Sequence, residues 1–398
     1  MSSSRHAAGH GPLAPVGGAA GPGPLAGLWS DRVPAARIAG ADPLGLDPFM
    51  ARLPELNAAG DTRAIIGGLR SAVPALAGLP AMEVWDSMAA VRDLGMAVAS
   101  LVRHGLTAGD APAGVEEALA EAGARVDMVP RETILHYSVW NPAGARRRTF
   151  TGAPGEHVLI ECSVAGTLPL EKAARALSTL VTRGVGTGEH RFTVTCLAAA
   201  RDLEQAAAHV HMERTGLDPV FFTRHLRPYF EPFTVRGVSY HAPAAAHLPL
   251  YAVDQAVWAA DAGHDRLDGF RADLVPYGLP VWTACHEDLL GVPSLLTRTL
   301  RDLDSRVTPG VLAGARALLA VLKAMIVFRG RHRRLVRGAY QDALRGAEIG
   351  SGGAGMDLID ELLAATRAYG ELAGTAVTRA SRHLVAEADL PGGGRRPA

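Results

Sequence analysis

The apolar residues of this chain recur mostly at intervals of three and four, the spacing that places them on one face of a helix. The clearest example runs from Leu312 to about Leu344, and it predicts the longest helix of the protein. Residues 82–104 repeat the pattern. Continuous runs of Val, Ile and Thr are rare, so few strands are expected. The pattern therefore predicts an all-α fold.

Proline and glycine divide the helical pattern into two parts. Residues 28–128 predict a small helical domain, and residues 129–389 predict a larger helical domain that binds the ligands of the protein. Residues 1–25 and 390–398 contain few large apolar side chains, and we expect both tails to be disordered. The larger domain is interrupted at residues 184–188, 227–249 and 351–355.

Charge and composition favour a small molecule as the partner. Forty basic residues balance forty acidic ones, which gives no electrostatic argument for nucleic acid or a membrane surface. Cys162, Cys196 and Cys285 lack the spacing of a metal site or of covalent haem attachment, and they are expected to be reduced thiols. No apolar run is expected to cross a bilayer, so the sequence predicts a cytoplasmic protein. The run Arg146–Arg148 is interpreted as a solvated loop.

One histidine lies on the apolar face of the long predicted helix. His332 shares its stripe with Leu318, Leu322, Met325, Phe328, Leu335, Val336 and Ala339. An imidazole between aliphatic side chains suits the proximal side of a haem, whereas a core histidine bonded to a neighbour gives the same pattern. Arg329 flanks the stripe and is expected to face a haem propionate or to pair with an acid.

A polar loop, Glu348–Gly353, follows this helix. It holds three glycines within four residues, which allows the backbone to approach a ligand closely, and Ser351 adds a hydroxyl group. An ordinary flexible connection has the same composition. The loop alone does not distinguish the two.

At this point the residues resemble a known family. Arg329-Gly-Arg-His332, Val336, Tyr340 and Gly350-Ser-Gly-Gly353 look like the haem helix and glycine loop of the indoleamine and tryptophan dioxygenase superfamily. The chain resembles more closely a bacterial branch, the monodechloroaminopyrrolnitrin synthases of pyrrolnitrin biosynthesis. Seven blocks match this branch in order, over roughly residues 40 to 370: Leu53-Pro-Glu-Leu-Asn57, Arg92-Asp-Leu-Gly95, Ser100-Leu-Val-Arg-His-Gly105, Pro130-Arg-Glu-Thr133, Val139-Trp-Asn-Pro142, Leu226-Arg-Pro-Tyr-Phe-Glu-Pro232 and Glu348-Ile-Gly-Ser-Gly-Gly353.

The resemblance implies a two-domain helical fold with non-covalent haem b in the larger, C-terminal domain. It implies that His332 is the axial iron ligand and that Arg329 and Ser351 contact the cofactor. Asp254 falls at the position of an acid that pairs with the arginine matching Arg329, so we predict that ion pair. The implied activity is oxidation of tryptophan or a derivative, chlorinated or not, with dioxygen as co-substrate in secondary metabolism.

The segment Asp218–Arg227 resembles the substrate-binding segment of the superfamily. Phe222 falls where an aromatic ring packs on the indole, and Arg227 falls where a guanidinium binds the carboxylate of the amino acid. Arg227 also precedes a proline, so ending a helix or pairing with Glu231 is an equal alternative. Thr223 replaces an aromatic residue of the relatives, which leaves the shape of the pocket open.

Tyr340, Ser351 and Gly352 match positions near the haem and the substrate. They are therefore further candidates for substrate binding, and a core tyrosine and a loop cap are the alternatives. No residue is identified as a catalytic acid or base.

Three classes of function remain open from the sequence. The first is a haem oxidoreductase, which either rearranges the indole toward an aminophenylpyrrole or cleaves its pyrrole ring. The second is a haem-binding sensor or carrier without turnover, an alternative that Thr223 supports. The third is a helical interaction protein without cofactor, in which His332 is a core residue. The sequence leaves open the stereochemistry of the substrate and the oligomeric state.

Overall fold

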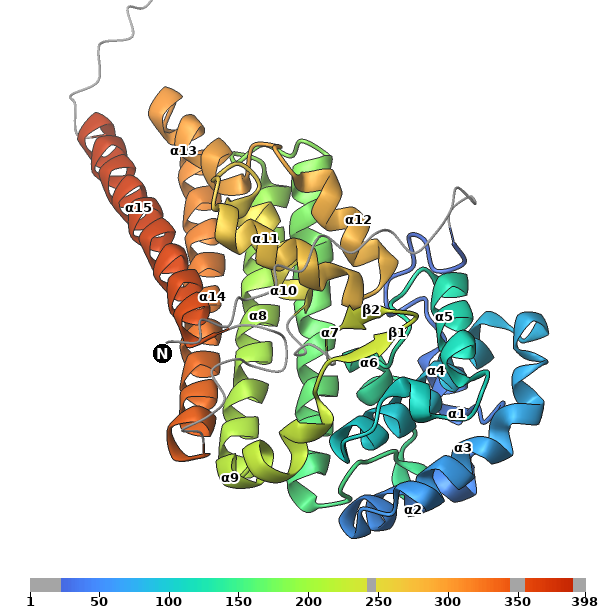
Figure 1. The fold of residues 1–398 in the computed structure, drawn as a ribbon. Helices are drawn as coiled ribbons and strands as arrows, with labels where there is room; N and C mark the ends of the chain where they lie inside the picture. Colours follow the sequence, from blue (N-terminus) through green and yellow to red (C-terminus); the bar gives the residue numbers. More distant parts are fainter. Residues whose placement is uncertain (1–22, 242–247, 344–354, 389–398) are drawn as a thin grey trace, which may run out of the picture.

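The computed structural model describes residues 23–241, 248–343 and 355–388. Helices form nearly all of the secondary structure in these ranges (Figure 1), so the predicted all-α fold is confirmed. Two short strands, β1 (Phe233–Val235) and β2 (Val238–Tyr240), pair as an antiparallel hairpin. The predictions for residues 1–22 and 389–398 lie outside the described residues. Leu25, which the sequence placed in the tail, is instead fully buried.

Short helices make up the N-terminal part of the molecule, drawn in blue and teal in Figure 1. Among them, α4 is central: every residue from Ser87 to Leu101 is buried, which explains why this segment is so rich in small and apolar side chains. The side chain of Asp61 caps α3 by accepting a hydrogen bond from the backbone N–H of Ala64 at 2.9 Å. The helices of this part are α1 (Ala35–Gly40), α2 (Asp47–Ala59), α3 (Thr62–Leu76), α4 (Val84–Arg103), α5 (Val115–Val126) and α6 (Ile134–Tyr137).

Four long helices dominate the rest: α7 (Pro154–Thr182), α8 (His190–Gly216), α14 (Pro309–Ala343) and α15 (Met356–Ala388). The first two form a hairpin whose turn contains Gly184 at a φ of 61°. Helix α14 begins against this turn, because a Cβ on Gly314 would lie only 2.0 Å from the carbonyl oxygen of Thr187. Helix α14 therefore runs beside α8 from the same end, and its residues near 330 lie beside the C-terminal part of α8.

Shorter helices connect these long ones. They are α9 (Pro219–Phe221), α10 (Leu248–Asp254), α11 (Asp265–Leu274), α12 (Pro280–Leu289) and α13 (Leu295–Ser305). Single π-helical turns follow α9 and α10, at Phe222–Leu226 and Gln255–Ala259. The 3₁₀ turns are Leu79–Ala81, Ala108–Asp110, Gly144–Arg146, Arg227–Tyr229 and Val275–Tyr277.

Two large hydrophobic cores organise the molecule. The first core contains buried residues between Leu25 and Ile160. It also includes residues of the β1–β2 hairpin, of the turn Val275–Tyr277 and of α12. The second is formed mainly by α7, α8, α10 and α14. Because the first core contains residues on both sides of position 129, the domain division at that position stays a prediction.

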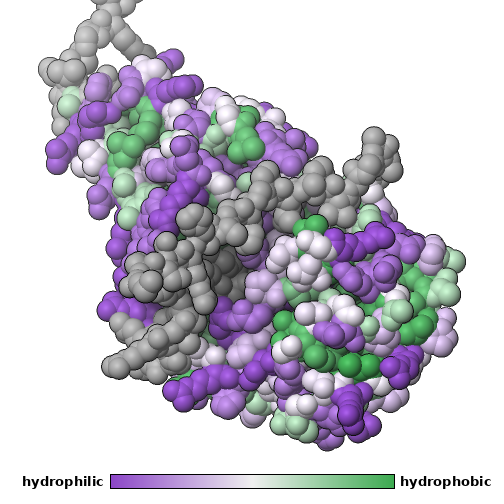
Figure 2. All heavy atoms as spheres, in the orientation of Figure 1, coloured by the Kyte–Doolittle hydropathy of each residue, from purple (hydrophilic) through white to green (hydrophobic). Residues whose placement is uncertain are grey.

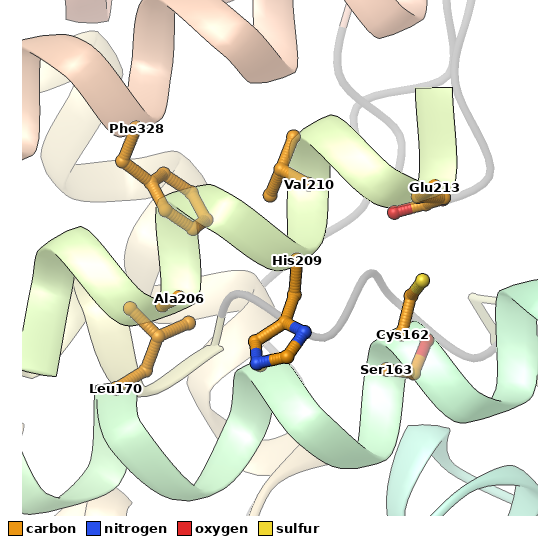
Figure 3. Close-up of a pocket in the computed structure, with 9 residues that line it drawn as sticks. Cys162, Ser163, Leu170, Ala206, His209, Val210, Glu213 and Phe328 are labelled. Atoms are coloured by element: carbon orange, nitrogen blue, oxygen red, sulfur yellow. The ribbon is translucent and has the colours of Figure 1, made fainter. Parts of the chain in front are cut away.

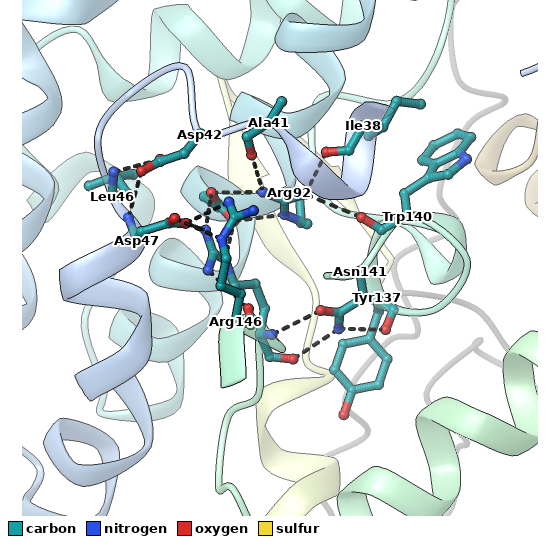
Figure 4. A network of polar contacts seen from close by, with 12 residues as sticks. Ile38, Ala41, Asp42, Leu46, Asp47, Arg92, Tyr137, Trp140, Asn141 and Arg146 are labelled. Carbon is teal, nitrogen blue, oxygen red and sulfur yellow. Dashed lines mark hydrogen bonds and ion pairs between the residues drawn. The ribbon is translucent and has the colours of Figure 1, made fainter. Parts of the chain in front are cut away.

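Buried ion pairs and hydrogen bonds connect different segments of the N-terminal part (Figure 4). Arg92 donates to the Asp93 carboxylate at 2.8 and 3.0 Å and to the carbonyl oxygens of Ile38 and Trp140. Arg148 donates to the same carboxylate at 3.1 and 3.2 Å. The expectation of a solvated loop at Arg146–Arg148 is therefore wrong for Arg148, which is 1% exposed. The charges that neutralise it come from residues distant in the sequence.

Helix α14 is long and apolar enough over Pro309–Gly338 to meet the length and composition of a membrane span, which the sequence analysis did not anticipate. In the most apolar 18-residue window of that stretch, 56% of the residues are buried inside the protein, as in the core helix of a soluble protein. The face in Figure 2 is largely hydrophilic, with separate apolar patches. We therefore interpret α14 as a core helix.

Candidate functional site

Helix α14 positions the predicted iron ligand at the end of its buried stripe. Leu322, Met325 and Phe328 are at most 1% exposed, and His332 follows Phe328 by one helical turn on the same face. Burial, with the charge of Arg329 adding to it, lowers the pKa of His332 to about 4. The imidazole is therefore neutral at neutral pH, which is the form that binds a metal.

Arg329 connects this part of α14 to α10 and α15. Its guanidinium pairs with both carboxylate oxygens of Asp254 and donates to the hydroxyl of Thr366 on α15. The ion pair that the resemblance implies is thus present, between residues 75 positions apart. Asp254 is completely buried, and it also accepts from the indole Nε1 of Trp258 at 3.0 Å.

A second guanidinium shares the same carboxylate. The Nε of Arg271 lies 3.6 Å from Asp254, and its Nη1 donates to Asp268 at 2.7 Å. Its charged centre lies 4.9 Å from the ring centroid of Trp258. Sequence reasoning missed Arg271. The available signal was its spacing from Leu267 and Leu274, which places it on the buried face of α11.

These residues fit a haem on two observations. The imidazole of His332 is neutral and lies at the end of an apolar stripe. The Nε of Arg329 is buried and makes no hydrogen bond within the described part of the chain, although the other guanidinium nitrogens are paired. A buried donor of this kind suits a carboxylate such as a haem propionate.

The predicted substrate segment lies against α14. Asp218 begins it by capping α9, with its carboxylate accepting from the backbone N–H of Val220 and Phe221. The next turn is π-helical, a local widening that is common at functional sites. The hydroxyl of Thr223 is directed to the carbonyl oxygen of Pro219 at 2.6 Å, and Phe222 is half-buried against the first core.

Arg227 forms an ion pair with Glu231, four residues further on. This is the arrangement that the sequence offered as the alternative to carboxylate binding. The side chain of Arg227 is 14% exposed and that of Glu231 is 43% exposed. The ion pair therefore opens to solvent on the Glu231 side.

Three further candidates cannot be placed. Ser351 and Gly352, with the loop Glu348–Gly353, lie outside the described residues, and so does the side chain of Tyr340. Their roles remain predictions.

A small cavity adds residues that the sequence analysis did not identify (Figure 3). It lies between α7 and α8 and is closed on one side by Phe328 of α14, one turn before His332. Its polar lining includes Cys162, His209 and Glu213. Desolvation raises the pKa of Glu213 to about 7. The sequence held no signal for this cluster, because α7 contributes Cys162 from about 50 positions upstream.

The chain matches the model of a known protein family. A family model described as "Monodechloroaminopyrrolnitrin synthase PrnB" matches residues 80–368. The matched region begins just before α4, includes α14 and ends within α15. It therefore covers Asp254, Arg329, His332 and the predicted substrate segment Asp218–Arg227.

Proposed function

The chain belongs to the monodechloroaminopyrrolnitrin synthase family, and on this premise we propose that it is a haem-dependent oxidoreductase that acts on tryptophan or a tryptophan derivative with dioxygen. Membership makes the chain an oxidative enzyme of secondary metabolism with a substrate derived from tryptophan. The haem, its ligand and the reaction are the proposal. The observation that carries it is the neutral imidazole of His332 at the end of a buried stripe, next to an anchored Arg329.

His332 would hold the haem iron, and Arg329 would donate to a propionate. Haem b supplies the one-electron and oxygen chemistry that protein side chains lack. The residues of the chain would position the cofactor. Asp254 and Thr366 hold the guanidinium of Arg329 in place, and Arg329 lies three residues from His332 on the same side of α14. Ser351 is proposed as a further cofactor contact.

The indole is proposed to pack on Phe222, with Thr223 leaving more room than an aromatic residue. Arg227 is proposed to bind the carboxylate. Its present partner, Glu231, is partly exposed, and such a pair stabilises a protein by at most about 1 kcal/mol. A carboxylate ligand that excludes water can therefore displace Glu231. Tyr340, Ser351 and Gly352 remain candidates for the same pocket.

Within this family we propose rearrangement of the indole toward an aminophenylpyrrole. Mass spectrometry of the product formed from tryptophan or a chlorinated tryptophan under oxygen tests this. N-formylkynurenine as the product would instead assign ring cleavage. Binding of dioxygen by the reduced protein without consumption of the indole would assign a carrier, the function that Thr223 keeps open.

Carboxylate binding has its own test. Arg227→Gln is expected to weaken tryptophan binding by roughly tenfold to a hundredfold, the range for a hydrogen bond between charged groups. Arg224→Gln is the matched control, because Arg224 lies in the same π-helical turn and is exposed. If the two variants bind tryptophan with equal affinity, Arg227 does not bind the carboxylate of the substrate.

A further inference from the structure

The cavity beside Phe328 has an apolar end and a polar end. Figure 3 shows Phe328 and Leu170 at one end and Glu213, Cys162 and Ser163 at the other. The side chain of His209 lies between them. Because Phe328 precedes His332 by one turn on the same face of α14, the cavity lies on the side of α14 that presents the imidazole.

The cavity contains one carboxylate, that of Glu213, and the described residues provide no counter-ion for it. Within the described residues its carboxylate makes no hydrogen bond and no ion pair, although it is partly buried. A carboxylate that is withdrawn from water without a partner destabilises the folded state. The arrangement therefore favours a ligand that carries a positive charge.

The size of the cavity limits what can enter. Its volume is about 10 Å³, close to the lower limit for a single water molecule. An ammonium group is close to a water molecule in size, whereas an indole ring is far larger and must lie elsewhere. No set of three His, Cys, Asp or Glu side chains in the described ranges is placed to hold a metal ion. Among the groups that an amino acid carries, the one whose charge and size suit this cavity is the ammonium group.

We propose that the polar end of this cavity binds the protonated primary amine of the amino-acid substrate, with Glu213 as its counter-ion. The inference rests on the proposed function, because it assigns one end of the same substrate. Ser163 and His209 offer further acceptors for the N–H groups. Glu213 then selects amino acids over indole acids that lack the amine.

The titration of Glu213 gives the inference a pH signature. Its pKa of about 7 means that the carboxylate gains its charge between pH 6 and 8. The neighbouring groups are Cys162 from α7, whose pKa burial raises to about 11, and His209 from α8, while α14 contributes the uncharged Phe328. Affinity for an amine should therefore rise over this range, and affinity for an acid without an amine should not rise with it.

Calorimetric titration of the holoenzyme with two ligands tests the inference. L-Tryptophan and indole-3-propionate share the indole and the carboxylate, and only tryptophan carries an amine. The wild type is expected to prefer tryptophan by roughly tenfold to a hundredfold at pH 8. Glu213→Gln should abolish that preference while leaving the affinity for indole-3-propionate unchanged. Glu204→Gln, an exposed position on the same helix, should keep it.

A preference that survives in Glu213→Gln overturns the amine site and leaves the proposed function standing. A wild type that binds neither ligand overturns the proposed function itself. The pH series on the wild type needs no variant: a preference that does not increase from pH 6 to pH 8 also overturns the amine site, and it indicates that the cavity holds only water.

Discussion

Replacement of Asp254 by asparagine isolates the charge that holds the proposed haem helix. Asparagine keeps the shape of the side chain but removes the negative charge that Arg329 and Arg271 share. Loss of one partner from a buried ion pair typically reduces the free energy of unfolding by about 3 to 5 kcal/mol, because a charge stays buried without compensation. Taking about 2.1 cal/mol/K of unfolding entropy per residue for 398 residues, the expected decrease in Tm is about 4 to 6 °C.

The matched control lies one turn further along α14. Arg333 pairs with Asp360 of α15, and the carboxylate of that pair is 45% exposed. Asp360→Asn should therefore reduce the free energy of unfolding by at most about 1 kcal/mol. Thermal unfolding followed by circular dichroism compares the two variants in one buffer. Equal destabilisation by the two substitutions would refute the view that Asp254 is the buried electrostatic anchor.

Two further predictions concern packing and pH. Gly95→Ala should destabilise the protein by about 1 to 3 kcal/mol in urea unfolding, because its Cβ would lie 2.4 Å from the Glu132 carboxylate; Gly67→Ala, which meets nothing within 4 Å, should not. Glu213→Gln should be more stable than the wild type by on the order of 1 to 3 kcal/mol at pH 8 and nearly equal to it at pH 4. The pKa of Glu213 is raised from 4.5 to about 7, so ionisation costs the wild type stability as the pH rises through this window. A stability difference that stays constant with pH would contradict this, and Glu204→Gln should show none.

The sequence predicted best those elements whose cause is local. Periodicity alone gave the helix at residues 82–104 and the long helix around His332, and the structure places them at Val84–Arg103 and Pro309–Ala343. Their boundaries differ by a few residues, because caps and packing decide where a helix ends. The π-helical turns were not predictable, since no spacing of apolar residues marks them.

Buried charges were predicted poorly from the residues themselves. The Asp254–Arg329 pair came from the resemblance, because nothing local connects a carboxylate and a guanidinium 75 residues apart. Arg148 was misjudged for the same reason: its partners, Asp47 and Asp93, lie about 101 and 55 positions away. A charged side chain is assigned to the surface unless its counter-charge is known, and the counter-charge is a product of the fold.

The cavity residues show a further limit. Cys162, His209 and Glu213 are unremarkable in sequence, since a thiol, an imidazole and a carboxylate on amphipathic helices usually have no common role. Only the antiparallel packing of α7 and α8 brings them together. Their chemistry follows from desolvation, which no single stretch of sequence specifies.

Absorption spectroscopy tests most directly whether His332 holds haem iron. Purified wild type, His332→Ala and a surface control, His190→Ala, are each titrated with hemin, reduced and exposed to carbon monoxide. The wild type and the control should give the same intense Soret band, shifted by carbon monoxide, and the His332→Ala spectrum should lose it or change strongly. A wild type that binds no hemin, or a His332→Ala spectrum identical to the wild type, would contradict the account.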